Sequence, residues 1–122
     1  TLQKMSGSRV GAAKMLENAN AAIVVIADES KTDVWVEDCS IAMSNMHLAA
    51  STLGIGSCWI QGRLRETPDG QSTEDYLRDI LGYPEKMHLE AILSLGIPAV
   101  HPEGHSLDEI PENKVHYEKY GN

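Results

Sequence analysis

The stretch Gly54-Ile55-Gly56-Ser57-Cys58-Trp59-Ile60-Gln61-Gly62 predicts a short strand with glycine at both ends, directly after a long apolar helix. Gly54 marks the end of that helix, because glycine accepts the left-handed backbone that closes many helices. Glycine also lacks a Cβ, so a planar ligand can come close to the backbone amides of such a strand. The segment therefore contains a helix-to-strand connection and a candidate binding site, although glycines often mark nothing more than turns.

The helix before this segment is predicted to cover residues 33–53. Thr32 or Asp33 can cap its start, and Glu37 and Asp38 place negative charge in its first turns, where the helix dipole favours it. Apolar residues surround much of this helix, so we expect it to be buried on several sides, at the centre of a domain or of a dimer. These residues are Val34, Cys39, Ile41, Ala42, Met43, Met46, Leu48 and Ala49.

Two more strands are expected, one on each side of this pair in the sequence. Residues 21–28 are small and β-branched apolar residues closed by Asp28, which predicts a central strand buried on both faces. Residues 88–96 alternate well enough for another strand, ended by Gly96. With the helices, these strands predict a small sheet in an α/β or α+β domain.

Two further helices are expected. Residues 5–18 predict a weak helix that contains two glycines. An amphipathic helix begins at Ser72 or Thr73 and is stopped by Gly82. The residues after 98 carry many charges and too few apolar side chains for a core of their own, so they are either disordered or laid over another surface.

Composition excludes several classes of function. The chain has 122 residues and a formal net charge of −8, without the basic patch that binding to nucleic acid requires. Its longest apolar stretch is too short to span a bilayer. Cys39 and Cys58 lack metal-site spacing and are predicted to be buried free thiols, which favours a cytoplasmic protein. His101 and His105 do not form a metal site, because the proline and glycine between them prevent helical spacing.

The residues show no catalytic constellation of side chains. Ser57 and Cys58 have no base nearby in the sequence, so packing is the simpler interpretation of the thiol. A flavin ring is one planar ligand that suits the glycine-flanked strand, since its N5 and O4 edge needs donors that backbone amides supply. Arg63 and Arg65 follow the strand and can face a phosphate or a reduced flavin's negative charge, or else are simply solvated. Trp59 can stack on a ring or serve as packing.

The order of four segments resembles the nitroreductase family. They cover most of residues 19–98, and four segments in the right order are more specific than any one alone. The segments are Ala21-Ala22-Ile23-Val24-Val25-Ile26-Ala27-Asp28; Trp35-Val36-Glu37-Asp38 continuing into Ile41-Ala42-Met43-Ser44-Asn45-Met46-His47-Leu48-Ala49-Ala50; Leu53-Gly54-Ile55-Gly56-Ser57-Cys58-Trp59-Ile60-Gln61; and Leu93-Ser94-Leu95-Gly96-Ile97-Pro98.

The resemblance implies an α+β fold, a small mixed sheet flanked by helices, in a homodimer with exchanged terminal arms. Residues 1–98 would form the core and residues 99–122 an extended arm that embraces the partner. It also implies bound FMN at the dimer crevice, with Trp59, Ile60, Gln61, Gly62 and Arg63 as the cofactor-binding residues and the amides near Gln61 and Gly62 facing the flavin edge.

The implied activity is an NAD(P)H-dependent flavin oxidoreductase. Hydride from NADH or NADPH would pass through FMN to a nitroaromatic, quinone or related acceptor, and no side chain need act as an acid or base. The family's basic amino-terminal segment, which grips the FMN phosphate, has no match in this chain, so the core is expected to be truncated at its amino terminus. The alternative is a non-catalytic dimeric module that has lost FMN together with that segment.

Overall fold

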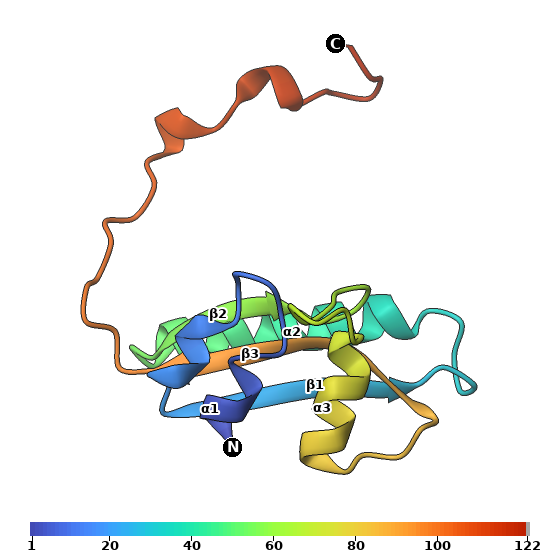
Figure 1. The fold of residues 1–122 in the computed structure, drawn as a ribbon. Coiled ribbons are helices and arrows are strands. Elements are labelled where there is room, and N and C mark those ends of the chain that lie inside the picture. Colours follow the sequence, from blue (N-terminus) through green and yellow to red (C-terminus); the bar gives the residue numbers. More distant parts are fainter. Residues whose placement is uncertain (122) are drawn as a thin grey trace.

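The computed structural model describes residues 1–121, which form a three-stranded sheet with helices on both faces and a long carboxy-terminal tail (Figure 1). No helix in this part of the chain is long and apolar enough to cross a membrane. In chain order the elements are α1 (Leu2–Met5), η1 (Lys14–Glu17), β1 (Ala21–Asp28), α2 (Trp35–Thr52), β2 (Gly56–Gln61), α3 (Thr73–Leu81), β3 (Met87–Gly96), η2 (Leu107–Glu109) and η3 (Glu112–Lys114).

The sheet has the order β1-β3-β2, and both pairings are antiparallel. The α+β class is therefore confirmed, although the expected mixed sheet is antiparallel throughout the described residues. The prediction that β1 is the central strand is wrong. The centre is β3, whose residues 89–94 are all buried, because it pairs on both edges and is covered on both faces.

A β-bulge interrupts the pairing of β1 with β3. Val25 lies opposite Ala91 and the next residue, Ile26, lies opposite Leu89, so Glu90 is the extra residue on β3. Such a residue is released from the regular alternation of the strand. The bulge is what allows an acidic side chain in the middle of an apolar strand to be directed differently from its neighbours.

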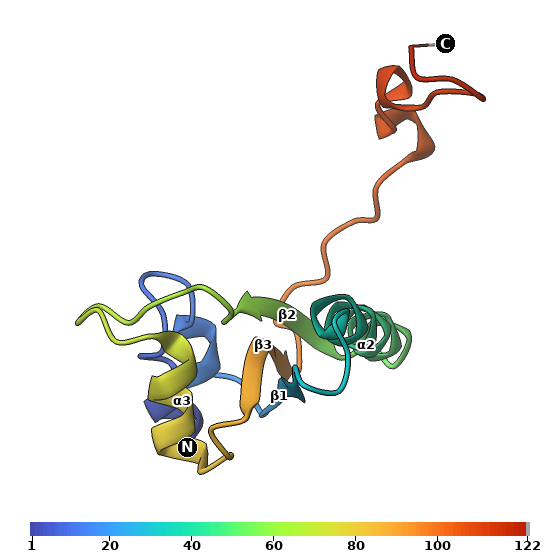
Figure 2. The same cartoon turned by 90° about the vertical axis from the view of Figure 1, so that its right-hand side faces the viewer.

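Helices cover both faces of the sheet, with α2 on one face and α1 and α3 on the other (Figure 2). Each face carries its own hydrophobic cluster. On one face α2 packs its Met43 against Ala91 and Leu93 of β3. On the other face lie α1, η1 and α3, and the buried residues of that cluster are Met5, Ala13, Leu16, Ile60, Leu77, Leu89 and Ile92. The sheet is thus the middle of three layers.

The helix predictions have mixed outcomes. α3 is confirmed: the Ser72 hydroxyl accepts a hydrogen bond from the Asp75 amide at 3.0 Å, and Gly82 ends the helix with φ of +74°. The prediction of one helix over residues 5–18 is wrong, because the chain forms only α1 and η1 there, with a turn at Gly11, whose φ is +69°. Glycine reaches this left-handed conformation without strain, and it ends helices rather than extending them.

α2 is buried on only one side within the single chain. Its start lacks a side-chain cap at Val34, and Thr32 instead accepts a hydrogen bond from the Val34 amide at 3.2 Å. Cys39, Met43 and Ala50 are buried, whereas Ile41 and Leu48 are each 61 % exposed. The single chain therefore buries this helix on one side only, and its burial in a dimer stays a prediction.

Residues 99–121 leave the sheet after Pro98 and extend away from the folded body (Figures 1 and 2). All of them are exposed except the half-buried His116. Their large apolar side chains are between 45 % and 93 % exposed; these are Val100, Leu107, Ile110, Val115, Tyr117 and Tyr120. The tail neither covers the body nor forms a core of its own.

Candidate functional site

At the carboxyl end of β2, successive side chains point to opposite faces of the sheet. Trp59 packs on the α2 side of the sheet with Met43. Ile60 points to the opposite face, where it is 1 % exposed in the core. Of the residues predicted to bind a cofactor, Ile60 therefore has only its backbone to offer, because its side chain is committed to packing.

The Gln61 side chain links β2 to the bulge in β3. Its Oε1 accepts a hydrogen bond from the Trp59 indole Nε1 at 2.9 Å. Its Nε2 donates to the Glu90 backbone oxygen and to the Arg63 backbone oxygen, each at 3.4 Å, and reaches the Glu90 carboxylate Oε1 at 3.5 Å. These contacts hold the side chain in one orientation at the end of the strand.

Gly62 has a packing role that the sequence did not indicate, and its part in cofactor binding stays a prediction. Its amide donates to the Glu90 backbone oxygen at 3.1 Å, so this donor is already engaged within the chain. A Cβ at Gly62 would lie 2.5 Å from Cδ2 of Leu89 and 2.9 Å from its Cγ. Leu89 fills the space beside Gly62, so packing alone already requires glycine here.

The Gln61 backbone amide points away from β3, in contrast to the Gly62 amide. In an antiparallel pair, hydrogen-bonded and non-hydrogen-bonded positions alternate. Because Gly62 donates to Glu90, the neighbouring pair of Gln61 and Ala91 is a non-hydrogen-bonded one. β2 is an edge strand, so this alternation directs the Gln61 amide to the open edge of the sheet. By the same alternation the Trp59 amide also points to this edge, so the open backbone donors at the predicted site belong to Trp59 and Gln61.

A hollow of about 270 Å³ lies just past this strand end. The Arg63 guanidinium lies over the Trp35 ring, 5.6 Å from its centroid, and the Trp35 ring is 6.0 Å from that of His88. The structure thus brings together aromatic and cationic groups from α2, β3 and the loop after β2. The lining residues are Trp35, Gly62, Arg63, Leu64, Arg65, Ser72, Glu74 and His88.

Glu74 of α3 fixes the wall of this hollow. Its Oε2 accepts a hydrogen bond from the Leu89 amide at 2.6 Å, and its Oε1 lies 3.2 Å from the His88 Nδ1. The same carboxylate pairs with Arg78 at 2.8 Å, and this hydrogen bond raises the pKa of the Arg78 guanidinium. The start of β3 is therefore tied to α3 beside the candidate site.

Glu90 is the residue that sequence reasoning missed. It is 3 % exposed, and its carboxylate Oε2 has no hydrogen-bond partner within residues 1–121. A buried oxygen without a partner is costly and needs an explanation. The signal was present in the sequence, because Glu90 is the single charged residue in the apolar run of residues 89–93.

The remaining chemically reactive side chains lie elsewhere. Both cysteines are free thiols; Cys39 is buried, which raises its pKa, whereas Cys58 is only half-buried, contrary to prediction. Ser57 does have a base beside it, since its hydroxyl lies 2.6 Å from the Nδ1 of His47 on α2. Within residues 1–121, no cluster of three histidine, cysteine or acidic residues is placed to hold a metal ion.

The three-layer α+β fold thus places a hollow beside the end of β2, at the open edge of the sheet. The chain belongs to the nitroreductase family, a family of oxidoreductases: the family model matches residues 2–97. The resemblance read from the four sequence segments is therefore confirmed.

Two archaeal relatives show the extent of the match. A protein of Archaeoglobus fulgidus, provisionally named an NADH dehydrogenase/NAD(P)H nitroreductase, is 39 % identical over 112 residues, which are 88 % of this chain and 62 % of the relative. A protein of Methanothermobacter thermautotrophicus with the same name is 33 % identical to this chain. The match covers 87 % of this chain and 53 % of the relative. The chain thus spans little more than half the length of these relatives.

Solved structures agree with the fold. An FMN-dependent nitroreductase from Clostridium difficile R20291 superposes with a TM-score of 0.91 at 39 % identity, over 98 % of this chain and 71 % of that one. A protein from Bacteroides thetaiotaomicron, provisionally named an NADH dehydrogenase/NAD(P)H nitroreductase, superposes with a TM-score of 0.83 at 28 % identity. The match covers 98 % of this chain and 66 % of that one. A nitroreductase from Desulfitobacterium hafniense with bound FMN shares the fold at 18 % identity, with a TM-score of 0.61 over 97 % and 70 %.

Proposed function

We propose that this chain forms part of an FMN-dependent oxidoreductase that moves hydride from NADH or NADPH to a nitroaromatic, quinone or related acceptor. The observation that carries the proposal is the open amide of Gln61, at an edge strand beside a hollow with aromatic and cationic walls. The family and the names of the relatives support it. The cytoplasmic location stays a prediction.

The residues at the strand end fit a flavin in part. Bound FMN would supply the chemistry of hydride transfer between the nicotinamide and the acceptor. The Gln61 amide is the donor for the polar ring edge, and the Gln61 side chain, held by Trp59, keeps that strand end in place. Arg63 supplies positive charge next to it. Gly62 packs against Leu89. Ile60 can contribute only its backbone, because its side chain lies in the core.

The site is proposed to be completed by a second copy of the chain. α2 leaves Ile41 and Leu48 exposed, and an apolar groove of about 230 Å³ lies between it and the sheet. Burial of such a surface is the main drive for association. The exposed apolar side chains of residues 99–121 suit an arm that lies on the partner. Leu48→Glu in the full-length protein should shift the species seen in light scattering from dimer to monomer.

Two variants of Gln61 separate its amide from its side chain. Gln61→Pro removes the N–H, which an edge strand tolerates when that group points outward, whereas Gln61→Ala removes only the side-chain network. If the amide binds FMN, the proline variant of the full-length protein should lose on the order of tenfold in FMN affinity relative to the alanine variant. Equal affinities would rule out this donor.

The activity itself is tested on the purified full-length protein. We expect flavin absorbance that is bleached by NADH or NADPH and restored by a nitroaromatic or quinone. Colourless protein that takes up no added FMN would refute the proposal and favour a non-catalytic dimeric module.

A further inference from the structure

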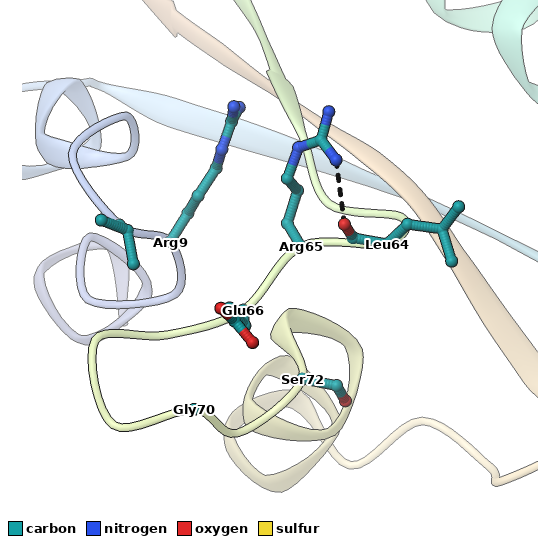
Figure 3. Close-up of a pocket in the computed structure, with 7 residues that line it drawn as sticks. Arg9, Leu64, Arg65, Glu66, Gly70 and Ser72 are labelled. Carbon is teal, nitrogen blue, oxygen red and sulfur yellow. Dashed lines mark hydrogen bonds between the residues drawn. The ribbon is translucent and has the colours of Figure 1, made fainter.

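A second hollow lies beside the candidate site, between the loop that follows α1 and the loop that follows β2 (Figure 3). Its volume is about 660 Å³. The two loops are joined by a hydrogen bond from the Val10 amide to the Glu66 backbone oxygen at 3.2 Å. We name this hollow the arginine cleft; its lining residues are Arg9, Val10, Leu64, Arg65, Glu66, Gly70 and Ser72.

The two arginines of the cleft lack acidic partners. The chain has 18 acidic residues against 10 Lys and Arg, yet neither Arg9 nor Arg65 forms an ion pair within residues 1–121. By contrast, Arg78 pairs with two carboxylates. Guanidinium groups left without carboxylates in an acidic chain are available to an external anion.

Arg65 is held in place by its own loop. Leu64 adopts a φ of +55°, which is unusual for a residue with a side chain. Its carbonyl oxygen accepts a hydrogen bond from Arg65 Nη1 at 2.9 Å. Figure 3 shows Arg9 and Arg65 extending in the same direction from opposite walls, with Glu66 set lower between them. Two cations from separate loops thus face the same space.

The walls of the cleft also include apolar side chains. Val10 is 58 % exposed and Leu64 is 79 % exposed, although both lie next to the cations. Ligand pockets commonly combine apolar walls with a few charged groups and have volumes of roughly 300–1,000 Å³. The cleft therefore suits an organic body that carries a charged end, and not an inorganic ion alone.

Glu66 limits the charge of that ligand. Two guanidinium groups and one carboxylate leave the cleft with a single net positive charge. A monoanion neutralises this single positive charge, although the Glu66 carboxylate still opposes the binding of any anion. Guanidinium groups bind carboxylate and phosphate oxygens in forked geometry.

We propose that the arginine cleft binds an organic monoanion, either a carboxylate or a singly charged phosphate ester, through Arg9 and Arg65. The cleft shares Leu64, Arg65 and Ser72 with the hollow at the end of β2 but does not include Gln61 or Arg63, and its proposed anion binding goes beyond the proposed oxidoreductase function. It gives the protein a place for the charged end of a substrate or cofactor next to the candidate redox site.

The proposal is tested by calorimetric titration of the full-length protein, saturated with FMN if it binds FMN. The probes are benzoate, diphenyl phosphate and the neutral isostere benzamide. We expect one of the two anions to bind and to weaken as salt is raised, and benzamide not to bind. Binding of benzoate identifies a carboxylate site, and binding of diphenyl phosphate identifies a phosphodiester site. Binding of neither anion would overturn the proposal, whatever the redox activity.

Variants that remove either a positive or a negative charge from the cleft make the test specific. Arg9→Gln and Arg65→Gln should each lower the affinity for the anion on the order of tenfold, since each removes a charged hydrogen bond. Glu66→Gln should raise the affinity for the anion several-fold, because it removes the repulsion between the Glu66 carboxylate and the anion. Lys31→Gln, which removes an exposed cation outside the cleft, serves as the charge-matched control and should change nothing. Equal effects of the cleft and control variants would show that binding is nonspecific and refute the assignment.

Discussion

Replacing Gly62 by alanine tests whether this glycine serves packing or ligand approach. The new Cβ would lie 2.5 Å from Leu89 Cδ2, while carbon atoms normally pack at about 3.5–4.0 Å, so Leu89 must move by about 1 Å. Leu89 is fully buried and has little freedom to move. Overpacking of this kind costs about 1–3 kcal/mol, which we expect as the loss in the free energy of unfolding of the full-length protein.

The assay is urea unfolding followed by far-UV circular dichroism. Gly104→Ala is the matched control, since a Cβ there meets nothing within 4 Å, and it should leave stability unchanged. Leu89→Ala alone should cost about 2–5 kcal/mol, and the double variant should lose less than the sum, because the smaller side chain makes room for the Cβ. If Gly62→Ala is as stable as the control and yet loses FMN, glycine serves ligand approach and the packing explanation is refuted.

Three other outcomes follow from the geometry. Ser72→Ala should cost about 1 kcal/mol in urea unfolding through loss of the α3 cap, whereas Ser44→Ala, at an exposed position inside α2, should cost nothing. Ellman's reagent should react with Cys58 before Cys39, whose burial raises its pKa, and Cys58→Ser should remove the fast phase; a fast phase that persists would contradict this. Burial raises the pKa of Tyr83 to about 12, so its phenol stays neutral above pH ~10, where an unfolded tyrosine ionises, and folded-state stability falls as pH rises through this range. Absorbance titration should show one late phenolate that Tyr83→Phe abolishes.

Elements with local signals could be predicted from the sequence. α3 has a serine cap, acids in its first turn and a glycine stop, all within one short segment, and each is found in the structure. The end of α2 and the start of β2 were also marked by nearby glycines. Such signals are reliable because the interactions that produce them join residues close together in the chain.

Features that depend on distant residues could not be predicted in this way. β1 and β3 are both rich in apolar residues, and only the pairing across the sheet decides that β3 is central. The role of Gly62 depends on Leu89, and the bulge at Glu90 depends on the register with Ile26. The arginine cleft likewise joins Arg9 to Arg65 across two loops, so neither residue alone pointed to it.

The position of β3 also has a consequence for synthesis. Among the described strands, β1 and β2 each pair only with β3, which is the last of the three to be translated. A nascent chain on the ribosome can therefore form no part of this sheet until Met87–Gly96 has emerged from the exit tunnel. Until then β1 has no partner strand among residues 1–121, and its apolar side chains stay accessible to chaperones.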